Sequence, residues 1–398
     1  MAEKQNTPEI RFEGFTDPWE QRKFSELYVV NNERNESCEL GYDKTLSVAT
    51  MTYNGGSGAA ENSLSTYKVI RMGDIAFEGH ANKEHAYGRF VLNDAGDGLM
   101  SPRFSCLRPI IEQRYSFWKY YISRESTMHP VLVNATKNGT MMNELVPADL
   151  MRESILVPVL YEQEAIGCFF KRLDSLITLH QRKYDKLCTV KKSMLDKMFP
   201  KPGETEPEIR FEGFTDPWEQ RKLGDLISVY IAHAGPEEDV TVLTSSRDGI
   251  QKQEDHFGRL QQHDTSDWNL IPYGYCTYRN RSDDGLFTFN VNKVADRGIV
   301  SKFYPVFETP ECDADFLVAY LNSSQEIRKK LFVLAVGTSQ VVLSYGALKE
   351  LSLLLPQNRE QSAIANVLNH IDNLITLHQR KLELLRNIKK SLLDRMFV

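Results

Sequence analysis

Apolar residues recur in alternating steps of three and four over two long stretches of the chain, each with one histidine in the series. In the first stretch they are Ile166, Phe169, Leu173, Ile177, His180, Tyr184, Leu187, Val190, Met194 and Met198; in the second they are Ile364, Leu368, Ile371, Ile375, His378, Leu382, Leu385, Ile388, Leu392 and Met396. This period predicts two amphipathic helices, each with a narrow apolar stripe. A helix from about Tyr161 to Met198 would be roughly 57 Å long. It could not bury its stripe alone, so we expect the two helices to pair.

The chain is an internal repeat. Leu173–Phe199 returns as Ile371–Phe397 with 17 of 27 positions identical, and Pro8–Lys23 recurs unchanged as Pro207–Lys222. We call these last two stretches the FEGF segments. Their aromatic residues, Phe12, Phe15 and Trp19 in the first copy, surround a Thr-Asp-Pro turn and predict a packing element, with a ligand site as the alternative.

Between the repeats, residues 24–157 and 223–355 differ in sequence but share a plan of short β-like runs and glycine turns, such as 67–77 and 268–278. They predict mixed α/β (α+β) globules. The expected fold is two globular domains separated by two long antiparallel, coiled-coil-like helices, with a pseudo-two-fold repeat. The expected segments are 1–157 (FEGF segment and globule), 158–200 (helix), 201–355 (linker, FEGF segment and globule) and 356–398 (helix).

The pseudo-two-fold repeat also predicts where the first FEGF segment lies. The second FEGF segment follows the first helix, eight residues after Phe199, whereas no helix precedes the first one. Under a pseudo-dyad, the first segment should lie beside Phe397 at the end of the second helix, although the two are far apart in sequence. The eight residues could span at most roughly 28 Å.

Composition narrows the possibilities. The 398 residues are 41% hydrophobic and 26% charged, the first residues are polar, and no apolar run approaches a membrane span, so a cytoplasmic protein without a membrane segment is expected. The six cysteines form no CxxC or Cys/His cluster, which argues against disulfides and a zinc site. The net charge of −6 does not favour nucleic acid for the whole chain, although a local basic surface is compatible with it.

Enzyme motifs are missing from the sequence. There is no phosphate-binding loop, no Asn or Asp before two prolines, and no H-x-x-x-H pair. Gly56-Ser57-Gly58 lacks the context of a dinucleotide site, and the acids Glu237, Glu238 and Asp239 are typical of an exposed loop. The sequence therefore predicts a non-catalytic chain without a metal site or cofactor.

Four stretches carry a family resemblance: FEGFTDPWEQRKLGDLI, TSSRDGIQKQEDHFGR, GIVSKFYPVF and the repeated LITLHQRK helix that ends in KKSLLDRMF. Over nearly its whole length the chain resembles the specificity (S) subunit of Type I restriction–modification enzymes. The resemblance implies two target-recognition domains that each read half of a split double-stranded DNA sequence. It also implies helices that separate them and bind two modification (M) subunits, with restriction (R) subunits joining through the complex. S-adenosylmethionine, ATP and Mg²⁺ would then be held by the partner subunits.

Base recognition favours loops that mix Arg, Lys, Asn, Gln, Tyr and Ser, because bidentate Arg or Lys contacts to guanine and Asn or Gln contacts to adenine carry sequence information. The first globule offers such a loop at residues 79–89, and the second at 277–281 and 245–247. The candidates are His80, Asn82, Lys83, Tyr87 and Arg89, with Ser245, Ser246, Arg247, Tyr278, Arg279, Asn280 and Arg281. Solvated surface turns are the alternative interpretation.

The repeated LITLHQRK stretch offers a partner surface. Its candidates are Gln181, Arg182, Lys183, Gln379, Arg380 and Lys381. Charges there also compensate the helix dipole, but two identical partners would better explain why both copies keep the stretch.

His180 and His378 lie on the apolar stripes, near the helix midpoints. In an antiparallel pair the midpoints meet, so we expect the two side chains to form one polar layer, or else each to bind a local carbonyl.

Two rival functions remain open on the sequence alone. A coiled-coil adaptor presenting two peptide-binding globules would show no salt-dependent DNA binding, whereas phosphate contacts make affinity fall steeply with salt. A free-standing DNA-modifying enzyme is disfavoured by the missing motifs.

Overall fold

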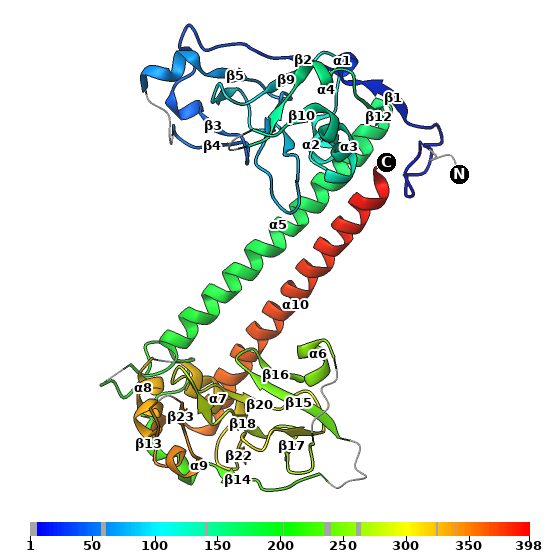
Figure 1. Ribbon diagram of the computed structural model, residues 1–398. Helices are drawn as coiled ribbons and strands as arrows, with labels where there is room; N and C mark the ends of the chain where they lie inside the picture. The colour runs from blue at the N-terminus through cyan, green and yellow to red at the C-terminus, as the bar shows by residue number, and fades with distance from the viewer. Residues whose placement is uncertain are drawn as a thin grey trace. The chain divides into compact units, whose positions relative to one another are not determined.

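Two helices of 38 and 39 residues dominate the computed structural model: α5 (Leu160–Lys197) and α10 (Asn358–Met396) (Figure 1). Both begin shortly after a proline, Pro158 and Pro356, as expected for helix entry. The structure describes residues 6–56, 61–139, 142–201, 203–234, 240–259, 264–323, 325–338 and 340–398. Ser57, Gly58 and the acids 237–239, discussed above, lie outside these residues.

The chain folds into two units. Unit 1 comprises Met1–His180 and Lys381–Val398, and unit 2 comprises Gln181–Arg380. Each unit therefore holds one globule together with part of both long helices.

The helices pair in antiparallel fashion within each unit. In unit 1 the ring of Phe170 stacks on Phe397 with centroids 5.8 Å apart, and Lys389 Nζ lies 2.6 Å from Asp174 Oδ1. In unit 2, Lys191 Nζ lies 2.6 Å from Asp372 Oδ1. The first part of one helix thus packs against the last part of the other, as the shared apolar stripes predict.

The globule of unit 1 contains a four-stranded antiparallel sheet in the order β2-β9-β6-β7. Smaller strand pairs and a bridge link β4, β3, β8 and β5. Helices α2 and α3 cover the sheet, where the ring of Trp118 meets that of Tyr28 at 5.6 Å. The bounds are α1 Phe24–Leu27, β2 Tyr28–Val30, η1 Tyr42–Lys44, β3 Leu46–Ser47, β4 Thr52–Tyr53, η2 Glu61–Thr66, β5 Lys68–Ile70, β6 Ile75–Glu78, β7 Arg89–Leu92, β8 Gly98–Met100, β9 Cys106–Pro109, α2 Tyr115–Tyr121, α3 Glu125–Ala135, β10 Thr136–Lys137, β11 Glu144–Leu145 and α4 Pro147–Leu150.

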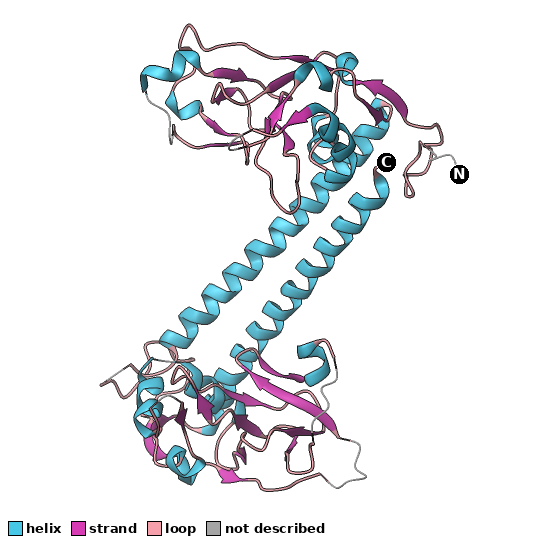
Figure 2. Ribbon diagram, viewed as in Figure 1, coloured by secondary structure: helices cyan, strands magenta, loops and turns pink. Residues whose placement is uncertain are grey.

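The globule of unit 2 repeats this arrangement. Its sheets have the orders β14-β22-β18-β20 and β16-β15-β21-β17, and helices α7 and α8 take the places of α2 and α3 (Figure 2). The predicted mixed α/β globules are confirmed. The bounds are η3 Leu223–Asp225, β14 Ser228–Val229, β15 Thr241–Ser246, β16 Gly249–Lys252, α6 Gln253–Phe257, β17 Asn269–Pro272, β18 Cys276–Tyr278, β19 Arg281–Ser282, β20 Phe289–Val291, β21 Arg297–Val300, β22 Val306–Glu308, α7 Ala314–Ser323, α8 Gln325–Leu334, β23 Val341–Val342 and α9 Tyr345–Leu348.

Each FEGF segment ends in a strand that closes its globule. β1 (Glu20–Lys23) pairs with β12 (Ser154–Val157), and β13 (Glu219–Lys222) pairs with β24 (Ser352–Leu355). Trp19 is 2% exposed and Trp218 is 4% exposed, and the Trp19 ring packs edge-on against Phe397. The segments are packing elements, as predicted.

Both FEGF segments bind the start of the next long helix by a buried ion pair. Arg11 donates to both carboxylate oxygens of Glu162, at 2.8 and 2.7 Å, and Arg210 does the same with Glu360, at 2.9 and 2.7 Å. The side chains of the two glutamates are only 1% and 2% exposed. Because the guanidinium fork matches a carboxylate, each pair fixes the angle at which its segment docks.

The predicted place of the first FEGF segment is confirmed. Ile10 N donates to Arg395 O at 3.0 Å, and the equivalent Ile209 N donates to Lys197 O at 3.0 Å. The two ends of the sequence therefore lie together in unit 1.

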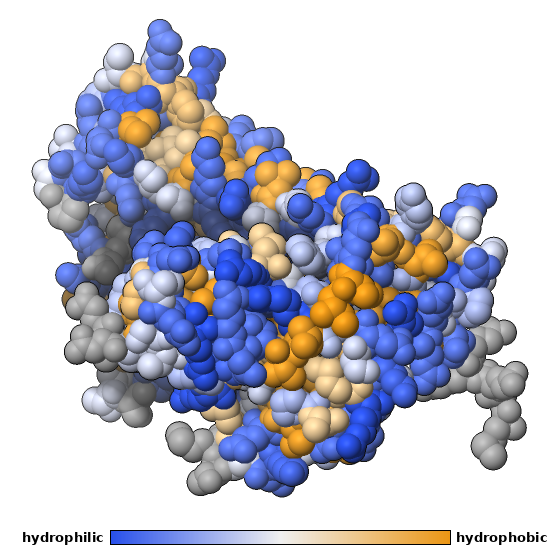
Figure 3. Space-filling model, turned by 90° about the horizontal axis from the view of Figure 1, so that it is seen from above, coloured by the Kyte–Doolittle hydropathy of each residue, from blue (hydrophilic) through white to orange (hydrophobic). Residues whose placement is uncertain are grey.

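Over the face seen in Figure 3, the surface is largely polar with smaller apolar patches.

Replacing Arg11 by Met should destabilise unit 1. The substitution leaves the buried Glu162 carboxylate uncompensated, which costs about 3–5 kcal/mol. Urea unfolding of the full chain measures the effect. Arg22→Met, which breaks the exposed pair with Glu26, is the control and should cost less than about 1 kcal/mol. Equal losses from the two variants would contradict the structural role of the Arg11 pair.

Candidate nucleic-acid interface

Four segments of unit 2 meet around a cleft of about 420 Å³. They are the end of β15 with the turn that follows it, helix α6, the loop from β18 to β20, and the connection from β21 to β22. The lining residues are Thr244, Ser245, Ser246, Arg247, His256, Phe257, Arg279, Arg281, Ser282, Asp283, Asp284, Leu286, Thr288 and Tyr304.

The cleft brings together five of the residues proposed from the sequence as DNA contacts. These are Ser245, Ser246, Arg247, Arg279 and Arg281. Three of the positions come from the end of β15 and the turn after it, and the other two come from a loop more than thirty residues later. Their convergence is therefore produced by the sheet, not by closeness in the chain.

The prediction for Tyr278 is wrong. This tyrosine is fully buried in the core, its hydroxyl donates to Leu343 O at 3.0 Å, and burial raises its pKa. It ends β18, a strand covered on both faces, so its side chain points into the core. Asn280 is half-buried, and its backbone binds Phe303 and Leu343.

An ion pair spans the cleft between two of its segments. Arg247 Nη2 donates to Asp284 Oδ2. Asp284 Oδ1 accepts from Ser282 Oγ at 2.9 Å and from the Leu286 backbone N–H at 3.1 Å. The Arg247 hydrogen bond, with those from Ser282 and Leu286, lowers the pKa of Asp284 to about 2, so the carboxylate is charged at neutral pH.

The remaining polar groups of the cleft are partly held in place. Arg281 lies over the ring of Phe303, 4.3 Å from its centroid, and Gln340 Nε2 donates to Asp283 at 2.8 Å. Arg279 is exposed on the cleft wall. Guanidinium groups and hydroxyls in such a setting suit both phosphate oxygens and base edges.

In unit 1 the equivalent loop, residues 79–88, joins β6 to β7 and is organised by Glu78. The Glu78 carboxylate binds His80 Nδ1 at 2.7 Å and accepts from Arg89 Nε at 3.2 Å. Arg89 Nη2 also donates to Ala49 O at 2.9 Å, which ties this loop to the turn between β3 and β4. Arg89 therefore has a structural role whatever else it contacts.

The other candidates in this loop form two groups: some build the loop, and others are exposed on its surface. Asn82 Oδ1 accepts from the backbone N–H groups of Glu84 and His85, at 2.8 and 2.9 Å, and so forms the turn itself. The Tyr87 ring packs edge-on against His129. His80 and Lys83 are exposed at the loop surface.

Sequence reasoning missed several groups beside these loops. Asp283, Asp284, His256 and Phe257 line the cleft of unit 2. In unit 1, the exposed Arg103 lies over Phe104 in the connection that corresponds to the one carrying Tyr304. The two aspartates could have been predicted from the sequence, because they follow Arg281 directly in the turn-forming stretch Ser282-Asp283-Asp284-Gly285.

The partner-surface residues lie on the exposed sides of the helices. Gln181 is half-buried and donates to Asp185 at 2.9 Å, whereas Arg182, Lys183, Gln379, Arg380 and Lys381 are exposed. Two leucines of the same stretch, Leu179 and Leu377, are 46% and 44% exposed and were not singled out from the sequence. His180 and His378 are half-buried, and their approach to one another stays a prediction.

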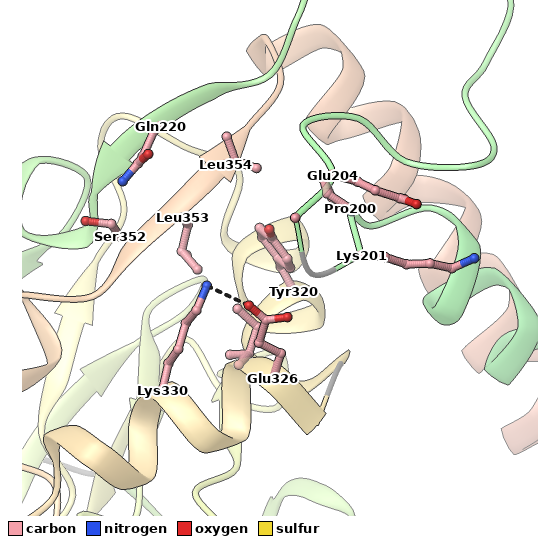
Figure 4. A pocket seen from close by; sticks show the side chains of 12 residues that line it. Pro200, Lys201, Glu204, Gln220, Tyr320, Glu326, Lys330, Ser352, Leu353 and Leu354 are labelled. Carbon is pink, nitrogen blue, oxygen red and sulfur yellow. Dashed lines mark ion pairs between the residues drawn. The ribbon is translucent and has the colours of Figure 1, made fainter.

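A smaller pocket of about 150 Å³ lies in unit 2 between the connection after α5 and the globule (Figure 4). Lys330 and Glu326 form an ion pair at its wall, 3.1 Å apart, and none of the predicted site residues lines it.

Among the residues that the structure describes, no group of three or more His, Cys, Asp or Glu side chains could hold a metal ion. Within the same residues, no helix has both the length and the apolar character to cross a bilayer.

Comparison with known proteins shows similarity to one family. The sequence model of the Type I restriction modification DNA specificity domain matches residues 215–387. The Type I restriction enzyme MjaVIII specificity subunit of Methanocaldococcus jannaschii is 24% identical over 262 residues, which is 60% of each chain. The putative type I restriction enzyme MjaX specificity subunit of the same organism is 20% identical over 421 residues, covering 95% of this chain and 92% of the relative. The chain is therefore similar to the specificity subunits of Type I restriction enzymes.

The fold of the chain agrees with that of a solved structure. The crystal structure of the S subunit of a Type I restriction–modification system from M. genitalium superposes with a TM-score of 0.55 at 14% identity, over 98% of this chain and 99% of that one. The expected two-globule architecture with long helices is thereby confirmed as a fold.

Replacing Arg279 by Ala should weaken double-stranded DNA binding by the assembled complex about tenfold, because the exposed guanidinium contributes charge and donors on the cleft wall. Fluorescence anisotropy at several salt concentrations measures this. Arg152→Ala removes an exposed arginine at the end of α4 and should leave affinity and salt dependence unchanged. An equal effect of both substitutions would argue against the cleft as the DNA surface.

Proposed function

We propose that this chain is a specificity subunit that reads DNA with each unit bound to one half of an asymmetric, bipartite target. The observation that carries the proposal is that two globules with one strand order present different chemistry at equivalent places. Phe77 and Tyr278 occupy matching positions, since both lie opposite a buried phenylalanine of the next strand. One residue further on, unit 1 has Glu78 and unit 2 has Arg279.

The contrast extends to the facing strand. Glu78 faces Arg89, whereas the position equivalent to Arg89 in unit 2 is Thr288, which lines the cleft. In unit 1 the Glu78 position holds a buried carboxylate that organises the 79–88 loop, whereas in unit 2 it holds an exposed guanidinium that can donate to guanine or phosphate. Two half-sites of different sequence follow from this difference.

The long helices act in this proposal as spacer and as docking site for two modification subunits. Leu179 and Leu377 occupy the same place in the two copies of LITLHQRK, and both are nearly half exposed beside exposed cations. Packing of the two helices against each other does not require apolar side chains on the outer face. Two identical partners bound to the two copies would bury them.

Catalysis belongs in this proposal to the partner subunits. The modification subunits would hold S-adenosylmethionine, and the restriction subunits, joined through the complex, would use ATP and Mg²⁺. Support comes from similarity to the Type I specificity domain over residues 215–387 and from a sequence without a phosphate-binding loop or an aminomethyltransferase motif.

Exchanging residues 24–157 for the corresponding globule of another specificity subunit should change one half of the methylated sequence and leave the other half unchanged. The reason is that each globule carries its own loops on a shared scaffold. Methylome sequencing of cells with the complete system reads both halves at once. The reciprocal exchange of residues 223–355 is the control and should change the opposite half. A change in both halves from one exchange would defeat the assignment, and an absence of any bipartite motif would favour the adaptor function.

Leu179→Lys should remove one of two modification subunits, and the double variant Leu179→Lys with Leu377→Lys should remove both, because a charge at the centre of an apolar contact is costly to bury. Mass photometry of the purified complex counts the subunits. Val229→Lys, at an equally exposed position on β14 (48%), should leave both partners bound. Retention of two partners by the double variant would exclude this surface as the docking site.

A further inference from the structure

The Arg247–Asp284 pair stands at the mouth of the unit 2 cleft, and folding stability does not account for it. The two side chains are 65% and 47% exposed, and ion pairs this exposed contribute little to stability. The pair connects the turn after β15 with the loop between β18 and β20, which are the two segments that carry most of the candidate DNA contacts.

Asp284 is held in position before any ligand arrives. One carboxylate oxygen accepts from Ser282 Oγ and from the Leu286 backbone N–H, and Ser282 itself is only 6% exposed. The other oxygen is presented to Arg247. A carboxylate fixed in this way restricts the rotamers of the arginine that it binds, so less conformational entropy is lost when that arginine meets a ligand.

The pair suits a base edge better than a phosphate. Its net charge is zero, so it adds little to the long-range attraction of the DNA backbone. The contact with Asp284 uses one of the five guanidinium donors, and the planar fork can still direct two parallel donors at one acceptor pair. Among the major-groove base edges, guanine offers two adjacent acceptors, O6 and N7, whereas adenine pairs an acceptor with a donor.

We propose that Arg247 reads a guanine in the half-site bound by unit 2 and that Asp284 is the positioning residue that sets its specificity. This inference rests on the proposed function, because it requires that the cleft face DNA. Arg279 and Arg281, which belong to the same cleft, supply the positive charge that the pair itself lacks.

A different role for the same ion pair would give the opposite behaviour. If Asp284 merely occupied Arg247 and had to be displaced by DNA, its removal would raise affinity for every sequence alike. If Asp284 positions Arg247, its removal lowers discrimination between bases at one place and leaves the others alone.

The test uses methylome sequencing of cells carrying the complete system, together with methylation rates of the purified complex on duplexes that differ at single base pairs. Asp284→Asn keeps the size of the side chain and removes its charge, and Arg247→Lys keeps the positive charge but loses the fork. Glu350→Gln is the matched control, because Glu350 forms an exposed ion pair with Lys222 in the same unit, outside the cleft.

We expect both cleft variants to retain the half-site of unit 1 and to relax one guanine position in the other half-site. A good bidentate contact discriminates by about 5- to 150-fold, so the preference for guanine should fall by about tenfold in Asp284→Asn and further in Arg247→Lys. Glu350→Gln should keep the wild-type motif.

Other outcomes overturn the inference. An unchanged motif in both variants would show that Arg247 touches no base. A uniform gain in affinity by Asp284→Asn would assign the pair a blocking role. Loss of all methylation in Asp284→Asn, with Glu350→Gln normal, would show a structural role instead. If the wild-type complex gave no bipartite motif, the proposed function itself would fail, which separates the two failures.

Discussion

The architecture depends on one constraint: a long helix with a narrow apolar stripe must have a partner along its length. Each unit meets this requirement by taking the first part of one helix and the last part of the other. In unit 1, Phe397 from the end of α10 completes an aromatic cluster with Trp19, Phe117 and Phe170. In unit 2, Phe199 from the end of α5 does the same against Tyr320 and Phe316. The FEGF segments, with their buried Arg–Glu pairs, then lock each helix end to the start of the other.

Within this frame, the two globules reach one fold by different chemistry. The buried Asp74 carboxylate pairs with the half-buried Arg108 at 2.9 Å in unit 1, and the hydrogen bond to Asp74 raises the pKa of Arg108. At the matching positions of unit 2, the Tyr275 hydroxyl donates to Glu308 at 3.0 Å. In both units a side-chain hydrogen bond thus joins these equivalent positions. It comes from a charged pair in unit 1 and from a neutral tyrosine hydroxyl in unit 2.

The repeats made the scaffold predictable from the sequence. Helix periodicity and two near-identical repeats were enough to predict the long helices, their antiparallel pairing and the place of the first FEGF segment. Individual site residues were harder to predict, because a loop sequence does not show which side chains build the loop. Asn82 and Arg89 have the composition of DNA contacts but hold the loop together, and Tyr278 ends a strand that is covered on both faces. A comparison of the two globules would have placed Tyr278 beside Phe77, in the core. The same comparison would have found Asn93 and Asn292, both fully buried and each bound to a backbone carbonyl three residues later.

The shared core of unit 1 has a consequence for synthesis on the ribosome. Phe397 and the backbone carbonyl of Arg395 complete contacts that begin with Ile10 and Trp19, so the first globule to be translated contains the last residues in its core. Until residues 395–397 have been made, the part of Trp19 that Phe397 covers stays open, although its contacts with Phe117 and Tyr121 can already form. A nascent chain therefore exposes apolar surface of the first globule until these residues have been made, and surface exposed in this way favours aggregation.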